Sequence, residues 1–359
     1  MNNQFGNFFK DKKILITGHT GFIGSWLSIW LNELGANVIG YALPPLTKKD
    51  NFVVTKLQEK ILSIIGDIRD FDKLKSILKN YKPEIIFHLA AQPIVRASYE
   101  IPKDTYDVNI GGTVNIIEAF RRSNTSKVLI NITSDKCYEN REWIWGYREK
   151  DRLGGYDPYS SSKACSELIT SAYMRSYFNP NSSKNKKGIA SVRSGNIIGG
   201  GDWQTDRIIP DCIRAIINNQ AIVLRNPNAI RPWQYVLEPI RGYLTLAMRL
   251  WEDRKDFSGA WNFGPSNNSI FSVQDVVKNV IQIFGKGSYK SSLPHESNDL
   301  YETKILQLDS SKSYRYLGWN TVLNFEEMIR FTCDWYMEEM VDYDFDIRQI
   351  KSYFEKCKN

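Results

Sequence analysis

Short apolar runs alternate with amphipathic stretches along the first half of the chain. Runs rich in Ile, Leu and Val, as expected of buried strands, occupy 13–17, 37–41, 61–65, 85–89, 128–132 and 189–193. Apolar residues recur at helical spacing between them, at about 25–34, 71–78 and 109–122. Continuous apolar strands that alternate with helices are typical of a parallel sheet covered on both faces. The pattern therefore predicts an α/β fold with a doubly wound, Rossmann-type parallel sheet.

Three glycines, Gly18, Gly21 and Gly24, lie between the first predicted strand and the first predicted helix. Glycine permits a tight turn and a close approach of the backbone to a ligand, and the N-terminus of the helix offers N–H groups to a pyrophosphate. The spacing alone is weak evidence. Its position in the first βαβ unit makes it a strong indication of dinucleotide binding.

A tyrosine and a lysine four residues apart, Tyr159 and Lys163, form a second motif. Asp157 is a suitable N-cap and Pro158 suits the first helical position, so we expect a helix to begin here. The spacing places both side chains on one helix face. We expect the ammonium to lower the phenol's pKa from its usual ~10, so that the phenolate accepts a proton from a sugar hydroxyl while a nicotinamide accepts the hydride. An isolated pair at this spacing is also common on helix surfaces.

Composition and charge indicate which kind of binding partner and which cellular compartment to expect. The 47 Lys and Arg exceed the 40 Asp and Glu by 7 charges spread along the chain, which favours an anionic small substrate over nucleic acid. Five scattered cysteines without C-x-x-C spacing predict a reduced, cytoplasmic protein without disulfides, and three distant histidines disfavour a metal site. There is no run of some 18 apolar residues and no signal-peptide core, so we expect no membrane association.

The order of these motifs resembles the extended short-chain dehydrogenase/reductases, the family of nucleotide-sugar epimerases and dehydratases. The resemblance rests on the glycine turn, Asp67-Ile68, Leu89-Ala90-Ala91 and the Tyr–Lys pair, and it extends to 231–236 and 317–319, so it covers nearly the whole chain. Three longer strings, at 18–27, 133–138 and 194–203, are similar to the branch of CDP-glucose 4,6-dehydratases. Such long strings are more specific than the glycine spacing.

The resemblance implies a nicotinamide dinucleotide on the glycine turn, with Asp67 and Ile68 against its adenine. The cofactor contacts that it implies are Gly18, His19, Gly21, Phe22, Ile23, Gly24, Asp67, Ile68, Leu89, Ala90, Ala91, Tyr159 and Lys163. One position departs from the pattern. The second strand ends at Ala42, without the acidic residue that binds the ribose in many relatives and without an arginine for a 2′-phosphate. The residues leave NAD and NADP open; the branch implies NAD, with the ribose met by His19.

The catalytic residues implied by the resemblance are Ser134, Asp135, Lys136, Tyr159 and Lys163. Sugar-dehydratase relatives carry an Asp-Glu pair where this chain has Asp135-Lys136. The aspartate would be the acid that helps the C6 hydroxyl leave as water, and Ser134 would help Tyr159 orient the C4 hydroxyl. Whether Lys136 removes the C5 proton or steadies the enolate stays open, because lysine is a base only where burial or like charge lowers its pKa.

The substrate contacts implied by the resemblance are Ser134, Asn196, Arg207 and Arg231. Asn196 and Arg231 match positions that hold the diphosphate, which suits the donor fork of arginine. Arg207 is as readily a surface charge at a helix end. The expected substrate is CDP-glucose, and the family implies a homodimer formed through a helix bundle that includes the helix of Tyr159.

We expect a dinucleotide-binding domain at 1–193 with a return segment at about 234–264, and an interleaved substrate-binding domain at 194–233 and 265–359. The 359 residues are sufficient for one large and one smaller domain. The rival functions are a nucleotide-sugar 4-epimerase, a dehydratase of another nucleotide sugar and a non-catalytic dinucleotide sensor. Asp135-Lys136 disfavours the epimerase, and the retained Tyr–Lys pair disfavours the sensor.

Overall fold

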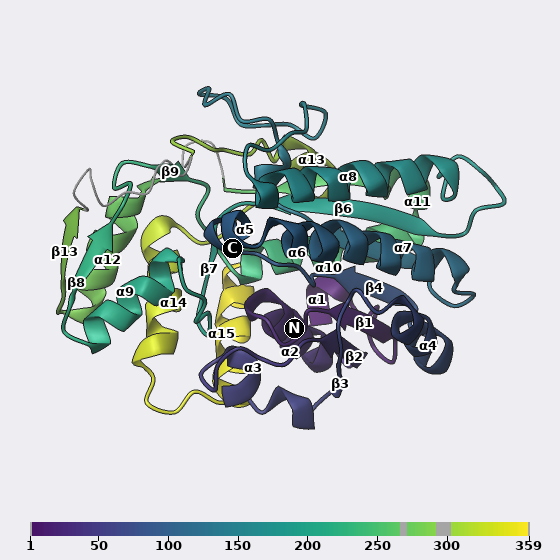
Figure 1. Ribbon diagram of the computed structural model, residues 1–359. Helices are drawn as coiled ribbons and strands as arrows, with labels where there is room; N and C mark the ends of the chain where they lie inside the picture. The colour runs from purple at the N-terminus through teal and green to yellow at the C-terminus, as the bar shows by residue number, and fades with distance from the viewer. Residues whose placement is uncertain (1, 266–270, 292–302, 358–359) are drawn as a thin grey trace.

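A seven-stranded parallel sheet forms the centre of the computed structural model, which describes residues 2–265, 271–291 and 303–357 (Figure 1). The strand order is β3-β2-β1-β4-β5-β6-β11. The strands are β1 (Lys13–Thr17), β2 (Asn37–Ala42), β3 (Leu62–Ile65), β4 (Ile85–His88), β5 (Val128–Ile132), β6 (Gly188–Ser194) and β11 (Gly259–Phe263). The order reverses between β1 and β4, so the predicted doubly wound parallel sheet is confirmed.

Helices cover both faces of this sheet because its central strands are apolar on both sides. Ile14 and Ile16 of β1 point into one hydrophobic cluster, with α2 (Phe22–Glu33) and α10 (Leu237–Glu252), whereas Leu15 points into the opposite cluster, with α4 (Phe71–Tyr81) and α7 (Gly112–Arg122). The helices are α1 (Asn2–Phe5), α2 (Phe22–Glu33), α3 (Asn51–Val54), α4 (Phe71–Tyr81), α5 (Val95–Glu100), α6 (Pro102–Tyr106), α7 (Gly112–Arg122), α8 (Pro158–Ser176), α9 (Ile208–Ile217), α10 (Leu237–Glu252), α11 (Arg254–Phe257), α12 (Val273–Phe284), α13 (Ser311–Leu317), α14 (Phe325–Met337) and α15 (Tyr343–Lys356).

In the described part of the chain, three small two-stranded sheets lie outside the main sheet, and the one formed by β8 (Ala221–Leu224) and β13 (Ser288–Ser291) is on the left in Figure 1 together with α9 and α12. Strand β7 (Ile197–Ile198) pairs with β10 (Gln234–Tyr235), β8 (Ala221–Leu224) pairs with β13 (Ser288–Ser291), and β9 (Ile230–Arg231) pairs with β12 (Phe271–Ser272). Between β10 and β12 the chain returns to the main sheet, where β11 lies parallel to β6 at the edge. The division into two domains stays a prediction.

The helix predicted at 109–122 is interrupted. Its first residues form a π-helical stretch, Asp107–Gly111, and only Gly112–Arg122 is α-helical. The stretch turns Asn109 inward, where its amide donates to the backbone oxygen of Gln92 (3.1 Å) and to Ser162 of α8 (2.9 Å). Such stretches frequently occur at functional sites. In the described part of the chain, no helix has the length and apolar character needed to cross a membrane.

Candidate active site

A cleft of about 1030 Å³ lies at the carboxyl ends of the sheet strands, where doubly wound folds bind their ligands. Residues of α9, β8 and β9 line the side of the cleft opposite the sheet. The cleft brings together all the predicted site residues except His19. Those that line it are Gly18, Gly21, Phe22, Ile23, Gly24, Asp67, Ile68, Leu89, Ala90, Ala91, Ser134, Asp135, Lys136, Tyr159, Lys163, Asn196, Arg207 and Arg231.

The glycine turn is packed too tightly for side chains at two positions. Gly18 has a φ of 79°, and a Cβ there would lie 2.8 Å from the backbone nitrogen of Ala90. A Cβ on Gly24 would lie 2.1 Å from the carbonyl oxygen of Gly18. The turn therefore presents bare backbone and the N-terminus of α2 to the cleft. This arrangement suits the pyrophosphate of a dinucleotide.

The structure does not bring the His19 side chain to the cleft, contrary to the prediction that it meets the ribose. The side chain is fully buried, and its Nε2 lies 2.7 Å from the Ser63 hydroxyl of β3. Its ring occupies space that a side chain on Gly40 would need, because a Cβ there would lie 2.3 Å from the imidazole. Burial lowers the pKa of His19 to about 4, so the imidazole is neutral.

Tyr41 and Ala42 at the end of β2 line the cleft, followed by Leu43 and Leu46, and the Tyr41 hydroxyl donates to the backbone oxygen of Asp67 (2.6 Å). Asp67, at the end of β3, lines the cleft nearby, but its carboxylate already binds Arg69, with 2.6 Å between Oδ2 and Nη2. Neither an acidic residue nor an arginine of β2 stands at the ribose position, as the sequence indicates.

The predicted start of the tyrosine helix is confirmed. Asp157 caps α8 by accepting hydrogen bonds from the backbone N–H (2.8 Å) and the hydroxyl (2.6 Å) of Ser160. Tyr159 and Lys163 are 8% and 7% exposed, so the alternative of a solvated surface pair is wrong. Lys163 donates from Nζ to the carbonyl oxygen of Ile132 at the end of β5 (3.3 Å). The helix thus directs both groups against the end of the sheet.

The predicted lowering of the phenol's pKa is wrong for the protein without its ligands. Burial raises the pKa of Tyr159 to about 12, and a hydrogen bond from Ser134 and the charge of Arg207 act in the opposite direction. Burial also lowers the pKa of Lys163 to about 8. The four-residue spacing in the sequence is enough to predict that the two side chains share a helix face. The direction of their pKa shifts depends on burial, which the spacing does not indicate.

A 3₁₀ turn, Asp135–Cys137, follows β5 and faces Tyr159. Ser134 caps this turn: its Oγ accepts from the backbone N–H of Lys136 (3.2 Å) and donates to Oδ1 of Asp135 (3.0 Å). Asp135 is 3% exposed, and burial raises the pKa of its carboxyl, although the charges of Lys136 and Arg231 oppose the shift. The site therefore holds a carboxyl with a raised pKa beside a buried phenol.

Arginines line the side of the cleft opposite the sheet. Arg207 pairs with Asp202 (2.8 Å) and lies within electrostatic reach of Tyr159, so it is part of the site rather than a surface charge at a helix end. Arg231 is 4% exposed and donates to the backbone oxygen of Ile230 (2.9 Å). Asn196 lines the same wall. Positive charge is thus concentrated where an anionic substrate would lie.

Sequence reasoning missed a second set of charges at the cleft. Arg225, at the end of β8, donates to Asp206 (2.8 Å), and Arg96 of α5 approaches the same carboxylate (3.7 Å). The three residues connect elements that are far apart in the sequence, so no local spacing could have identified them. In the described ranges 2–265, 271–291 and 303–357, no group of three His, Cys, Asp or Glu side chains is arranged to hold a metal ion.

Comparison with known proteins places the chain in a family. Residues 15–332 match the family model described as GDP-mannose 4,6 dehydratase, and the chain belongs to this family of nucleotide-sugar dehydratases and epimerases. Within it, the chain is 48% identical over 331 residues to the CDP-glucose 4,6-dehydratase of Salmonella typhimurium, and the match covers 92% of each chain. The UDP-glucose 4-epimerase of Pisum sativum is 25% identical, with 90% of this chain and 95% of the relative covered.

Solved structures share the fold. An epimerase of Methanothermobacter thermautotrophicus superimposes with a TM-score of 0.79 at 22% identity, over 95% of this chain and 96% of that one. The dTDP-glucose 4,6-dehydratase of Bacillus anthracis, solved in complex with NAD, gives a TM-score of 0.74 at 22% identity, over 91% and 97% of the two chains.

His19→Gln should weaken the dependence of stability on pH if His19 is a core histidine. Below pH 6.5 the unfolded chain protonates this residue while the folded protein resists until about pH 4, so stability falls as the pH drops through this window. At pH 5 the loss is about 2 kcal/mol in the native chain and absent in the variant. Urea denaturation at pH 7 and pH 5 measures it. Equal pH dependence in both proteins would contradict the assignment.

Proposed function

We propose that the protein is a CDP-glucose 4,6-dehydratase, a hydro-lyase that converts CDP-D-glucose to CDP-4-dehydro-6-deoxy-D-glucose and water. The observation that carries the proposal is the position of Asp135, a buried carboxyl whose pKa burial raises, in one cleft with Tyr159 and Lys163. A dehydrogenase pair oxidises a sugar, and only a dehydratase also needs an acid to expel a hydroxyl. The 48% identical relative is a CDP-glucose 4,6-dehydratase, which supports the choice of nucleotide.

The cofactor that fits the glycine turn is NAD. The turn has no room for side chains at Gly18 and Gly24, and the end of β2 at Ala42 carries no arginine for the 2′-phosphate of NADP. The residues that would hold it are those that line the cleft from Gly18 to Ala91, together with Tyr159 and Lys163. When bound, the nicotinamide supplies a hydride acceptor for C4 and then a hydride donor for C6.

Oxidation at C4 requires a base for the O4 proton, and Tyr159 is that base. With a pKa of about 12 the phenol is a poor base at neutral pH, so it depends on positive charge close to it. Lys163 and Arg207 supply that charge, and the Ser134 hydroxyl, which lies beside Tyr159, helps to orient O4. Lys163, with a pKa of about 8, is mostly protonated at neutral pH.

Elimination follows from the acidity that the C4 ketone gives to the C5 proton. The C5–H bond breaks, its electrons form the C5–C6 double bond, and the C6 hydroxyl leaves as water with the proton of Asp135. Lys136 is the residue beside Asp135 that removes the C5 proton or steadies the enolate. Hydride addition at C6 and proton addition at C5 complete the product, so no net reduction of the cofactor occurs.

The substrate's diphosphate carries negative charge that the arginine wall of the cleft would balance. Arg231 and Asn196 are the proposed diphosphate contacts, and Arg207 lies between them and Tyr159. Arginine suits this task because its planar donors match phosphate oxygens.

Incubation with CDP-glucose tests the function directly. We expect a 4-keto-6-deoxy sugar without accumulation of reduced nicotinamide, whereas UDP-glucose and dTDP-glucose should react more slowly. Tyr159→Phe should lose turnover by roughly 10²-fold or more, because no other group takes the O4 proton. A 4-epimer of the sugar would identify an epimerase instead, and stoichiometric reduced nicotinamide would identify a plain dehydrogenase.

Asp135→Asn and Lys136→Ala should slow elimination while C4 oxidation survives. The asparagine side chain keeps the shape of the aspartate but donates no carboxylic proton, so loss of water should slow by roughly 10²-fold. Single-turnover reactions should then trap reduced cofactor and a 4-keto-hexose, with slower entry of solvent deuterium at C5. Dehydration at the native rate in both variants would remove the main support for the dehydratase assignment.

Two expectations from the family resemblance extend the proposal: a cytoplasmic location and a homodimer formed through α8. The outward residue Leu168 of α8 is 56% exposed, and Tyr106 of the neighbouring α6 is 37% exposed, which supports an apolar interface. Sedimentation velocity should find a dimer, and Leu168→Glu should shift it toward monomer. A native monomer would contradict the proposal.

A further inference from the structure

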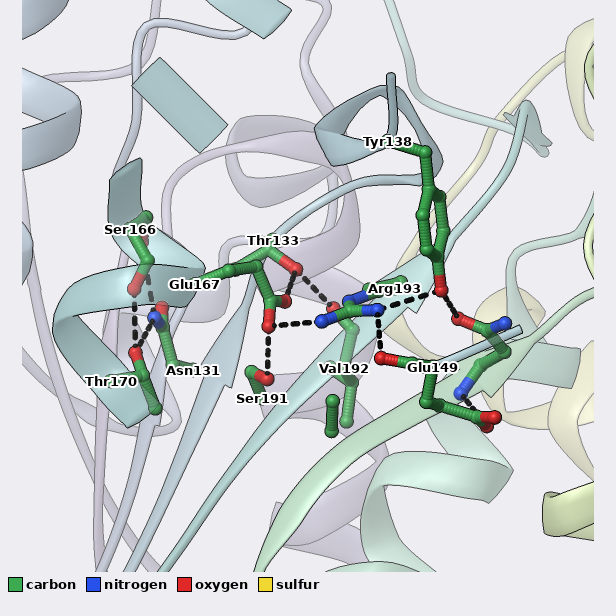
Figure 2. A network of polar contacts seen from close by, with 12 residues as sticks. Asn131, Thr133, Tyr138, Glu149, Ser166, Glu167, Thr170, Ser191, Val192 and Arg193 are labelled. Carbon is green, nitrogen blue, oxygen red and sulfur yellow. Dashed lines mark hydrogen bonds and ion pairs between the residues drawn. The ribbon is translucent and has the colours of Figure 1, made fainter. Parts of the chain in front are cut away.

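Beneath the Tyr–Lys pair, α8 and β6 share a buried ion pair that the proposed mechanism does not use. Glu167 and Arg193 are each 3% exposed, with 2.7 Å between Oε2 and Nη2. Burial of two charges is costly, and an ion pair offsets that cost only when further hydrogen bonds satisfy both groups. The partners that supply these bonds are therefore informative. Figure 2 shows them extending to both sides of the pair.

Glu167 accepts a hydrogen bond from the residue directly before the 134–137 turn. Its Oε1 accepts from the hydroxyl of Thr133 (2.5 Å), the residue directly before Ser134, and its Oε2 accepts from the hydroxyl of Ser191 (2.6 Å). The Thr133 hydroxyl also lies 3.0 Å from the carbonyl oxygen of Val192 (Figure 2). The last residue before the turn is thus fixed to α8 and to β6 together.

Arg193 donates a hydrogen bond to the residue directly after the same turn. Its Nη1 donates to the hydroxyl of Tyr138 (2.7 Å), the residue directly after Cys137, and its guanidinium lies over the Tyr138 ring at 4.8 Å. The Tyr138 hydroxyl in turn donates to Asn262 of β11 (2.7 Å). The two members of one ion pair therefore hydrogen-bond the residues on either side of Ser134–Cys137 (Figure 2).

Resting on the proposed function, we propose that Glu167 and Arg193 are positioning residues that clamp both ends of the 134–137 turn and keep Lys163 charged. The turn is three residues of 3₁₀ helix with few internal hydrogen bonds, so its own geometry does not hold Asp135 and Lys136 in place. A displacement of about 1 Å in reacting groups can cost roughly 10²-fold in rate. The clamp supplies the missing rigidity.

The charge of Lys163 depends on the same unit. The ionisable groups that face it are Tyr159 and Glu167 of α8, Cys137 of the turn and His88 of β4. Burial raises the pKa of Cys137 and of Tyr159 and lowers the pKa of His88 to about 3, so these three groups are neutral near pH 7. Glu167, one helical turn from Lys163, supplies the negative charge.

Arg193 keeps the Glu167 carboxylate ionised. Burial tends to raise the pKa of Glu167, but the charge of Arg193 and the hydrogen bonds from Arg193, Ser191 and Thr133 outweigh it and lower the pKa. The carboxylate therefore stays ionised although it is almost completely buried. A purely stabilising role accounts poorly for this arrangement, because buried ion pairs often add little to stability compared with apolar residues of the same volume.

Thr133→Val tests the clamp with the least disturbance, because it removes one hydroxyl and keeps the shape. Amide hydrogen exchange at 134–138 should rise about 10-fold or more, and Thr133→Ser, which keeps the hydroxyl, should restore the native rate. In single turnover, elimination should slow roughly 10- to 100-fold while C4 oxidation changes little. Native exchange at 134–138 in Thr133→Val would overturn the clamp.

Glu167→Gln tests the charge. Loss of the carboxylate removes the interaction that raises the pKa of Lys163, so the alkaline limb of the kcat/KM profile should move to lower pH by about one unit. Glu238→Gln is the matched control, since Glu238 is 1% exposed and lies 3.8 Å from Arg241, outside the cleft. It should lower stability without shifting the profile. An unshifted profile in Glu167→Gln, or an equal shift in Glu238→Gln, would overturn the charge role.

The exchange measurement separates this proposal from the proposed function, because it needs no substrate. A protein that leaves CDP-glucose unchanged, yet shows the expected exchange in Thr133→Val, would overturn the function and support the clamp. Turnover of CDP-glucose together with native exchange in Thr133→Val would support the function and overturn the clamp.

Discussion

The cost of burying charge against the end of a parallel sheet governs this site. Helix α8 turns Tyr159, Lys163 and Glu167 toward the sheet on one face, at successive spacings of four residues, and each is less than a tenth exposed. Removal of these groups from water is unfavourable unless partners replace the lost hydration. The end of β5, the polar residues of β6 and the 3₁₀ turn after β5 provide those partners. The proposed catalytic groups and the residues that support them are therefore one connected structure.

The same burial prepares the groups for opposite tasks. Burial raises the pKa of the Asp135 carboxyl, which suits a proton donor, and it raises the pKa of the Tyr159 phenol, which impairs a base. In the proposed mechanism the acid, Asp135, therefore needs only its pocket, whereas the base, Tyr159, needs positive charge from Lys163 and Arg207. This difference explains why a lysine one helical turn away accompanies the tyrosine. It also explains why an arginine from a distant segment reaches the same phenol.

Local patterns in the sequence predict much of this molecule. Apolar runs locate the strands of the main sheet, and the glycine spacing and the capped Tyr–Lys helix locate both halves of the cleft, because each pattern acts over a few residues. Properties that depend on several segments at once were out of reach. The inward turn of His19 depends on the space that Gly40 leaves on the neighbouring strand, and the phenol's pKa depends on burial. The pairing of Arg225 with Asp206 depends on where β8 is placed.

Strand β11 adds a constraint on how the protein is made. It completes the edge of the main sheet beside β6, yet about 65 residues separate the two strands in the sequence. Until residues 259–263 leave the ribosome, β6 is an open edge with unpaired backbone groups, the kind of surface that invites aggregation. Asn262 of β11 also accepts the hydrogen bond of Tyr138, so the last strand to arrive completes the support of the 134–137 turn. The synthesis of β11 thus completes the main sheet and the support of the 134–137 turn together.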